Sequence, residues 1–264
     1  MIARRKLPDE YLQWNAKWKA PFGRQLPFKI LPSFLHNSSF ARRIAGPFSY
    51  QPNNDTRTVE YPWAYFQSGI KAGQTAVDLG GGFSGFPFVL SKCGVDVTVV
   101  DPFLDYGPDR HYDRTPLEVA CELNRLFQTD VKYKVCGLPQ AEFISESLDV
   151  IFSVSVIEHL PKAVLDETLV EVKRILKVGG LFVFTVDMFL DLKPFTTRES
   201  NLFGCNQLLY DLVKMSGMEL VYGNPDEMYG AASFSADRIQ SNLSEFYLGS
   251  GYPVLVQTVV LRKV

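Results

Sequence analysis

The stretch AVDLGGGFSG, residues 76–85, decides the fold of this chain. An apolar run ends in an acid, Asp78, and leads into a glycine-rich turn, and the next apolar run, GVDVTVVD, ends in Asp101. This spacing is typical of a βαβ unit that holds a nucleoside, because glycines let the backbone approach the ligand and the distal acid receives ribose hydroxyls. The sequence therefore predicts an α/β domain with a nucleoside site at this turn.

The acid two residues before the first glycine helps to decide which nucleoside the turn binds. Gly80, Gly82 and Gly85 satisfy the dinucleotide pattern G-x-G-x-x-G, which indicates NAD. In such a site the position of Asp78 is normally a buried apolar residue, where an unpaired carboxylate would cost several kcal/mol. S-adenosylmethionine (SAM) carries an ammonium group that needs an anionic neighbour, and it has no pyrophosphate to cradle. The segment favours SAM, with NAD as the alternative.

Composition restricts the class of protein. With 264 residues, 46% apolar and 21% charged, the chain can form one domain with an elaboration. A net charge of -2 does not indicate a nucleic-acid binder. Residues 1–70 hold ten Lys and Arg against four Asp and Glu, a local +6, and the remainder holds 17 against 25, a local -8. Partner contacts are therefore expected in the first segment.

Cysteine usage and hydropathy indicate the compartment. The four cysteines are widely spaced, without a C-x-x-C pair or a histidine at metal-ligand spacing, and are typical of reduced thiols in a cytosolic protein. No apolar run approaches the roughly 20 residues of a membrane span, and the start MIARRKLPDEYLQ lacks the apolar core of a signal peptide. We expect a soluble, cytoplasmic protein.

The chain changes in texture near residue 70. Before it lie all three tryptophans and many phenylalanines, and prolines interrupt every helical pattern, which predicts an arm or lid over 1–70 that is not an independent domain. From 71 to 264, apolar strands alternate with amphipathic stretches, as in a parallel sheet covered by helices on both faces. Strands are predicted at 75–79, 96–100, 131–135, 148–153, 181–186, 218–222 and 254–261. An amphipathic helix containing Leu165 and Ile175 is predicted to end at Gly179–Gly180.

Four segments in this order resemble a class I, Rossmann-like SAM-dependent methyltransferase. They are VDLGGGFSG with Asp101, then LDVIFSVSVIEHL, then EVKRILKVGGLFVFTVD, and finally VLVQTVVLRKV. The resemblance extends from about residue 75 to 186, and more loosely to the C-terminus. It is to the type-11-like small-molecule and glycan methyltransferases of bacteria. It implies a doubly wound, mostly parallel seven-stranded sheet of order 3-2-1-4-5-7-6, with the last strand antiparallel.

The resemblance also implies a set of cofactor-binding residues. Gly80, Gly81 and Gly82 would let the loop turn under the methionine part of SAM, near Asp78. A loop that is merely structural is the alternative.

Beyond the glycines, Asp101 would accept both ribose hydroxyls, or else cap a helix before Pro102. Phe103 would lie against adenine or belong to the core. The family commonly has an acid after the third strand, where this chain has Gly137 and Leu138. Backbone groups there, or Glu142, would have to replace it.

The segment after the fourth strand faces the methyl group by this resemblance. Ser153 and Val154 would contact the cofactor, and Glu158 and His159 are the acid/base candidates, since a neutral imidazole can take a hydroxyl proton. The alternative is a helix start at which both residues have only structural roles. Relatives that bind a divalent metal have an acid where this chain has Ser155, so metal dependence is disfavoured.

Asp187, after the fifth strand, would orient the acceptor or cap the surface. In the arm, RTVEYPW at 57–63 resembles an element of bacterial methyltransferases from polysaccharide or secondary-metabolite pathways. Tyr61 would close over the sulfonium, or simply pack. Arg57 and Arg198 would bind an anionic acceptor group or remain solvated.

Four functions remain open from the sequence. The first is methyl transfer to a hydroxyl of a small molecule or glycan, with the arm and residues 188–210 and 224–251 as walls of the acceptor pocket. The second is methylation of RNA or protein, suggested by the basic, aromatic arm. The third is an NAD-dependent oxidoreductase. The fourth is a non-catalytic SAM-fold module.

Overall fold

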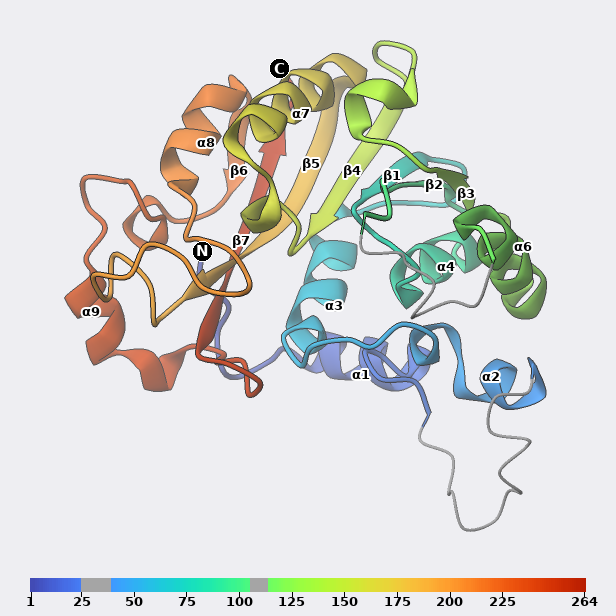
Figure 1. Ribbon diagram of the computed structural model, residues 1–264, viewed down its shortest axis with the longest axis horizontal. Helices are drawn as coiled ribbons and strands as arrows, with labels where there is room; N and C mark the ends of the chain where they lie inside the picture. Colours follow the sequence, from blue (N-terminus) through green and yellow to red (C-terminus); the bar gives the residue numbers. More distant parts are fainter. Residues whose placement is uncertain (25–38, 105–113) are drawn as a thin grey trace.

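The computed structural model describes residues 1–24, 39–104 and 114–264. A seven-stranded sheet runs through it in the order β3-β2-β1-β4-β5-β7-β6 (Figure 1). The strands are β1 (Thr75–Leu79), β2 (Asp96–Val100), β3 (Lys132–Lys134), β4 (Leu148–Val154), β5 (Leu176–Phe189), β6 (Glu219–Tyr222) and β7 (Val254–Arg262). The first five are parallel, and β7 is antiparallel to both β5 and β6. The predicted fold class and strand order are confirmed.

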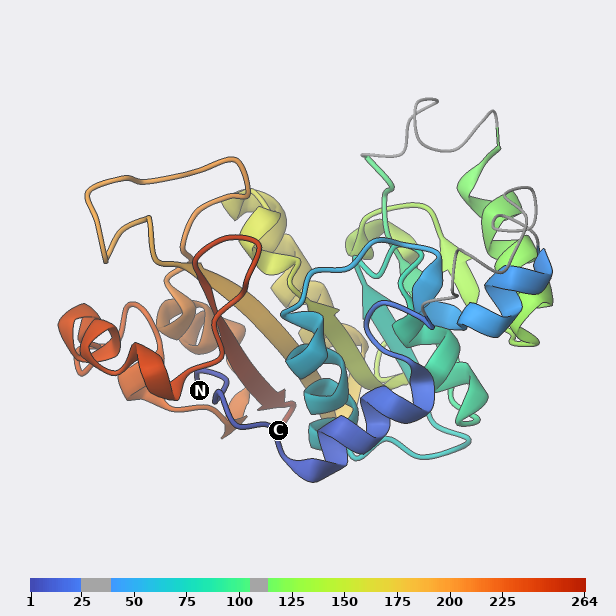
Figure 2. The same ribbon diagram turned by 90° about the horizontal axis from the view of Figure 1, so that it is seen from below.

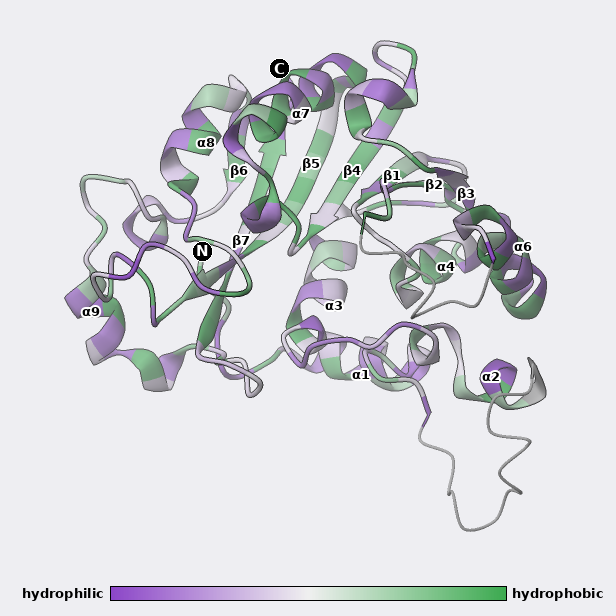
Figure 3. Ribbon diagram, in the orientation of Figure 1, coloured by the Kyte–Doolittle hydropathy of each residue, from purple (hydrophilic) through white to green (hydrophobic). Residues whose placement is uncertain are grey.

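Helices cover both faces of this sheet, and the inner strands are hydrophobic (Figure 3). One face packs against α1 (Asp9–Trp18), α3 (Arg57–Ser68), α4 (Gly85–Lys92) and α6 (Pro116–Phe127). The other packs against α7 (Lys162–Ile175) and α8 (Leu209–Ser216). The other helices of the described residues are α2 (Ser39–Ala45) and α9 (Ala236–Ser241), with short 3-10 turns at 47–49, 138–141, 157–159, 225–227 and 243–245. Both faces of the parallel strands are therefore buried, which explains their continuous apolar sequence.

The prediction that α7 ends at Gly179–Gly180 is wrong. The helix ends at Ile175, and Leu176 already has an extended backbone and pairs with Leu148. The two glycines lie inside β5, where a Cβ at Gly180 would stand 2.8 Å from the Lys177 carbonyl oxygen. Gly180 thus permits a close backbone approach, Gly179 has a positive φ of +82°, and neither glycine ends a helix.

The expectation that prolines interrupt every helical pattern before residue 70 is also wrong, because α3 continues through Pro62. A proline inside a helix leaves the carbonyl four residues earlier without its N–H donor. Here Asn15 Nδ2, from α1, donates to that carbonyl, Thr58 O, at 2.8 Å. The two helices lie side by side across the sheet (Figure 2). The contact between α1 and α3 thus satisfies the backbone group that Pro62 leaves open.

Residues at the start of the chain run along β7. Ile2 pairs with Gln257, and the Ala3 N–H donates to the Val256 carbonyl at 2.8 Å. Ile2 packs with Met188 and Leu255 in a separate apolar cluster under the segment that holds α9.

Within the part of the chain that the structure describes, no helix is long and apolar enough to cross a membrane. The division of the chain at residue 70 stays a prediction.

Candidate functional site

The loop between β1 and α4 depends on its glycines. Gly80 and Gly82 have positive φ, +69° and +51°, a conformation that side chains with a Cβ rarely adopt. A Cβ at Gly81 would collide with the carboxylate of Asp78. The Gly80 N–H donates to the Val100 carbonyl at 2.8 Å, which holds the loop against the end of β2. Because its glycines have no side chains, the loop backbone can lie close to the Asp78 carboxylate.

Asp101 stands at the end of β2 and binds the glycine loop directly. Its Oδ2 accepts from the Gly82 N–H at 3.0 Å, and its Oδ1 accepts from the Phe103 N–H at 2.6 Å. Each carboxylate oxygen can accept more than one hydrogen bond, so the group can still receive hydroxyls. The Phe103 ring packs at 4.8 Å from Phe83, and the neighbouring Pro102 is exposed.

Asp78 is a buried acid with one unsatisfied oxygen. Its side chain is 2% exposed, and Oδ2 has no hydrogen-bond partner among the described residues. Burial, together with the nearby Asp101 carboxylate, raises the pKa of Asp78 to about 8, against a smaller opposite effect of Arg57. An unpaired buried acid is costly, so this position calls for a cationic or hydrogen-bond-donating ligand.

A polar cavity of about 160 Å³ opens beside Asp78. Its walls come from three parts of the chain: the segment before α3 with α3 itself, the glycine loop, and the end of β4. The lining residues are Gln51, Pro52, Asn53, Asn54, Arg57, Tyr61, Asp78, Gly80, Gly81, Ser84, Val154 and Ser155. The cavity thus places one carboxyl and one guanidinium on its walls.

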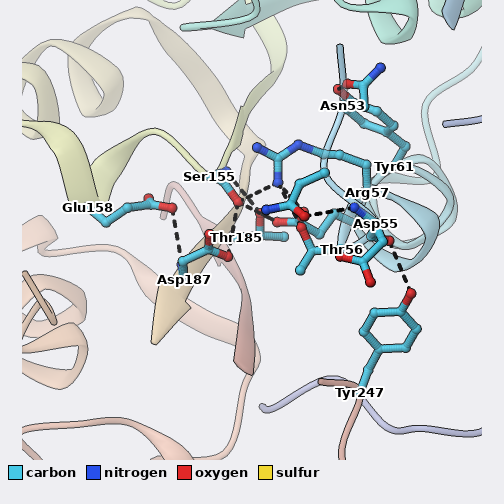
Figure 4. A network of polar contacts seen from close by, with 12 residues as sticks. Asn53, Asp55, Thr56, Arg57, Tyr61, Ser155, Glu158, Thr185, Asp187 and Tyr247 are labelled. Carbon is cyan, nitrogen blue, oxygen red and sulfur yellow. Dashed lines mark hydrogen bonds and ion pairs between the residues drawn. The ribbon is translucent and has the colours of Figure 1, made fainter. Parts of the chain in front are cut away.

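Arg57 belongs to a buried network at the ends of β4 and β5 (Figure 4). Its Nη1 pairs with Glu60 and donates to Ser155 Oγ at 2.7 Å. Glu60 is fully buried, and its Oε1 also accepts from Ser155 Oγ at 2.7 Å and from Thr185 Oγ1 at 2.5 Å. Ser155 has a positive φ of 48°, a strained conformation for a residue with a side chain. The network fastens α3 across the carboxyl ends of two strands.

Two further carboxyls adjoin this network. Asp187 accepts from Tyr252 OH at 2.9 Å, and its own N–H donates to Glu158 Oε1 at 3.2 Å. Burial, with Glu60 nearby, raises the pKa of Asp187 to about 7. Burial and the Asp187 carboxylate also hold the pKa of Glu158 well above its usual range. Asp187 therefore changes protonation near neutral pH, as a general base must.

The structure brings most of the expected cofactor residues together. Asp78, Gly80, Gly81, Tyr61 and Val154 line the cavity, while Gly82, Asp101 and Phe103 lie at the adjoining end of β2. The Tyr61 ring is buried, stacks on Phe86 at 5.3 Å, and its hydroxyl donates to Asn53 Oδ1 at 2.9 Å.

Other expected residues lie apart from the cavity walls. Gly137 and Leu138 lie at the start of a 3-10 turn, with the Leu138 side chain buried in the core under α7. Ser153 is fully buried inside β4, and its Oγ has no partner in the described ranges. His159 is exposed, whereas the adjacent Glu158 is buried and directed toward Asp187. Arg198 pairs with Asp191 at 3.3 Å on the surface. The roles assigned to these residues stay predictions.

Several residues of the site were not identified from the sequence. Gln51 accepts from the Phe83 N–H at 2.7 Å, and Asn53 accepts from Tyr61. Glu60, Thr185 and Tyr252 complete the network around Arg57 and Asp187. Glu60 lies within the RTVEYPW segment, which was the one available signal. The others are joined to their partners only by folding.

The described residues hold no group of three or more His, Cys, Asp or Glu side chains arranged for a metal ion.

Comparison with known proteins identifies a domain in the middle of the chain. Residues 77–184 match the family model described as a methyltransferase domain. No curated protein matches the chain.

Solved structures share the fold. YcgJ from Bacillus subtilis has a TM-score of 0.51 at 16% identity, over 77% of this chain and 97% of that one. A geranyl diphosphate methyltransferase in complex with SAM has a TM-score of 0.50 at 14% identity, over 81% and 93%. The [4+2]-cyclase SpnF has a TM-score of 0.55 at 12% identity, over 87% and 92%. One fold carries different reactions here, so the family model and not the fold indicates the chemistry. Residues 77–184 therefore form a methyltransferase domain, and the sheet order is the one expected of the class I, Rossmann-like, SAM-dependent methyltransferases.

Proposed function

We propose that the cavity beside Asp78 binds the amino-acid end of SAM, and that the protein transfers the methyl group to a hydroxyl of a small molecule or glycan intermediate. The cofactor assignment rests on the presence of two groups of opposite charge on the cavity walls. Asp78 offers an oxygen without a partner, and Arg57 also lines the cavity. A zwitterionic amino acid, with an ammonium and a carboxylate, matches that pair.

The fit of the nucleoside part rests on Asp101. Its carboxylate retains acceptor capacity beside two backbone N–H groups, at a loop that only glycines allow to pass close to Asp78. A dinucleotide fits less well, because its pyrophosphate would lie against the glycine loop beside the buried carboxyl of Asp78, whereas Asp101 suits the ribose of either cofactor. Asp78 therefore favours SAM over NAD.

Methyl transfer needs alignment more than acid/base chemistry. SAM supplies, when bound, a methyl group on a positively charged sulfur that is already a good leaving group. Positioning of the reactants can contribute roughly 7–11 kcal/mol, whereas a general base adds about 10²- to 10⁴-fold. The chain's part is to hold the acceptor at the strand ends and to exclude water there.

Asp187 is the side chain best suited to take the acceptor proton. It is buried behind Ser155, which lines the cavity, and its pKa of about 7 lets it accept a proton at neutral pH. Tyr252 orients it through Oδ2. The proton of the acceptor hydroxyl would pass to Asp187 as the oxygen attacks the methyl carbon.

Calorimetric titration tests the cofactor assignment. Wild type should bind SAM saturably and NADH not at all. Asp101→Ala should weaken SAM binding by about 100-fold or more, because hydrogen bonds to a charged group contribute about 1.5–3 kcal/mol each. Asp96→Ala, on the same strand and exposed, is the matched control and should bind as wild type. NADH binding without SAM binding, or equal affinity for SAM in Asp101→Ala, would refute the site. A screen of hydroxyl acceptors with methyl-labelled SAM then tests the acceptor class.

A further inference from the structure

An aromatic stack stands outside the carboxyl network on the acceptor side. Phe203 and Tyr252 are parallel, with ring centroids 4.4 Å apart and planes 15° apart, and Phe189 lies behind both. Phe189 is buried, but Phe203 is 41% exposed. The stack therefore presents an aromatic face to the outside.

This stack is continuous with the cavity. Tyr252 OH donates to Asp187, and Asp187 contacts Ser155, which lines the cavity wall. The loop before Tyr252 is also fastened to the segment before α3, since the Ser250 N–H donates to Asp55 Oδ2 at 2.8 Å and Tyr247 OH donates to the Asp55 carbonyl at 3.1 Å. The aromatic face therefore borders the place where an acceptor must lie.

The loop that carries Phe203 is held in place by its own contacts. Asn206 accepts from the Phe189 N–H at 2.7 Å and donates to the Phe189 carbonyl at 2.8 Å. Asn201 accepts from the Phe203 N–H at 2.8 Å. Gly204 passes so close to Glu158 that a Cβ there would stand 2.8 Å from the Glu158 carbonyl oxygen. These contacts fix the loop, and with it the position from which the Phe203 side chain projects.

The charges around the stack disfavour an anion. Glu60, Glu158 and Asp187 are all buried, and Arg57 pairs with Glu60 and, by the proposed function, also faces the amino-acid end of SAM. The two cations on the loop between Phe189 and Phe203 are paired as well, Lys193 with Glu199 at 3.2 Å and Arg198 with Asp191 at 3.3 Å. A phosphate or carboxylate on the acceptor would leave water here without a spare cation in this group of residues to pair with it.

We infer that Phe203 and Tyr252 form the seat of the acceptor, and that this seat takes a neutral, flat face, either the C–H face of a sugar or an aromatic ring, and rejects an anionic counterpart. Aromatic rings bind such faces by stacking and need no hydrogen bonds to do so. The inference rests on the proposed function, since it assigns the acceptor of that same site.

Two matched pairs of probes test the seat. Methyl β-D-glucopyranoside and its uronate, and 4-hydroxybenzyl alcohol and 4-hydroxybenzoate, differ within each pair by a CH₂OH group against a carboxylate. Their binding to the protein saturated with S-adenosylhomocysteine is measured by saturation-transfer NMR. One neutral probe should bind at least about tenfold more tightly than its anion, a difference of about 1.4 kcal/mol. If the glucoside pair shows this difference, the seat takes a sugar face, and if the benzyl pair shows it, the seat takes an aromatic ring.

Variants separate the seat from the rest of the site. Phe203→Ala should weaken the neutral probe by about tenfold. Leu202→Ala, the 91% exposed neighbour, should not. Tyr252→Phe keeps the ring and should keep probe binding. The inference is overturned if neither neutral probe binds, if Phe203→Ala binds it as wild type does, or if the anions bind equally well.

S-adenosylhomocysteine affinity, measured alongside by calorimetry, should be the same in Phe203→Ala and wild type. If wild type does not bind S-adenosylhomocysteine, the proposed function is refuted instead. The probes are then measured on the protein without S-adenosylhomocysteine.

Discussion

The proposed site has two halves that are built in different ways: a cofactor half around Asp78 and Asp101, and an acceptor half around Glu60 and Asp187. In the cofactor half, Asp101 is bound by the N–H groups of residues only 2 and 19 positions away. In the acceptor half, Glu60 receives hydroxyls from Ser155 and Thr185, 95 and 125 positions away. The first half is a local βαβ turn, and the second exists only when α3 docks across the strand ends. The difference teaches that the cofactor site can be recognised in a short sequence, whereas the acceptor site is a product of packing.

The halves also differ in how far they satisfy their own charges. Asp78 faces the cavity with an oxygen that has no partner in the described residues. Glu60, by contrast, pairs with Arg57 and accepts two hydroxyls. The cofactor half is therefore prepared for a charged ligand, while Glu60 and Arg57 in the acceptor half neutralise each other and Glu158 Oε2 near them has no partner in the described residues. The predictions below test this contrast.

The largest effect is expected at Glu60. Replacing it by alanine leaves the Arg57 guanidinium and two hydroxyls without their partner in a buried place, which should cost about 3–5 kcal/mol of unfolding free energy. Urea denaturation measures this loss. Glu60→Gln, which keeps the size and two hydrogen-bonding atoms, should lose less, and Glu167→Ala, exposed on α7, should lose almost nothing. A loss below about 1 kcal/mol in Glu60→Ala would show that the network does not hold the acceptor half together.

The next effect concerns the protonation of Asp78. Without a cation its pKa is about 8, so the acid is mostly protonated at pH 7. A bound ammonium should lower that pKa, and SAM binding should release up to about one proton at pH 7 and none well above pH 8. Calorimetry in buffers of different ionisation enthalpy measures the release. Asp78→Asn should abolish it, and proton uptake on binding would contradict the proposed contact.

Asp78 also makes the stability of the protein depend on pH, in the opposite direction to an acid whose pKa is lowered on folding. Its folded pKa is raised above the unfolded value of 3.8, so the stabilising contribution is full below about pH 4 and is lost as pH rises toward 8. Compared with Asp78→Asn, the ligand-free wild type should therefore become less stable over this interval. Thermal unfolding at a series of pH values follows the difference.

The smallest effect is expected at Tyr252. Its hydrogen bond lowers the pKa of Asp187, against the larger effect of burial. Tyr252→Phe should raise that pKa above about 7 and move the acidic limb of the pH dependence of kcat/KM to higher pH by up to about one unit, or 1.4 kcal/mol. Tyr247→Phe is the matched control, because its hydroxyl binds the Asp55 carbonyl instead. An unmoved limb in Tyr252→Phe would exclude Asp187 as the group that titrates.

Much of the fold was predictable, and the errors have physical causes. The strands at 75–79 and 96–100 were predicted with their observed bounds, because buried parallel strands are short apolar runs that end at polar turns. The errors at α3 and α7 arose where tertiary contacts override local signals. Asn15 compensates Pro62, pairing with β4 draws Leu176 out of the helix, and the glycine pair bonds to the backbone of Lys263.

The same contrast holds for the side chains of the site. Asp78, Gly80, Gly81 and Asp101 could be grouped from the sequence because their spacing along the chain already reflects their geometry. Glu158 and His159 are neighbours in sequence, yet the turn at 157–159 buries one and exposes the other. Spacing alone does not say which of two adjacent polar residues faces the interior of a 3-10 turn.

By itself, the sequence determined a nucleoside-binding α/β sheet, its strand order by resemblance, and the carboxyls of the cofactor half. Those features depend on contacts within one βαβ unit, where the chain is too short to adopt many arrangements. Only the tertiary structure decided that Arg57 and Glu60 lie beneath Ser155, that Tyr252 holds Asp187, and that Phe203 covers Tyr252. These pairs join segments far apart in the sequence, and their geometry is set by the packing of whole helices and loops on the sheet.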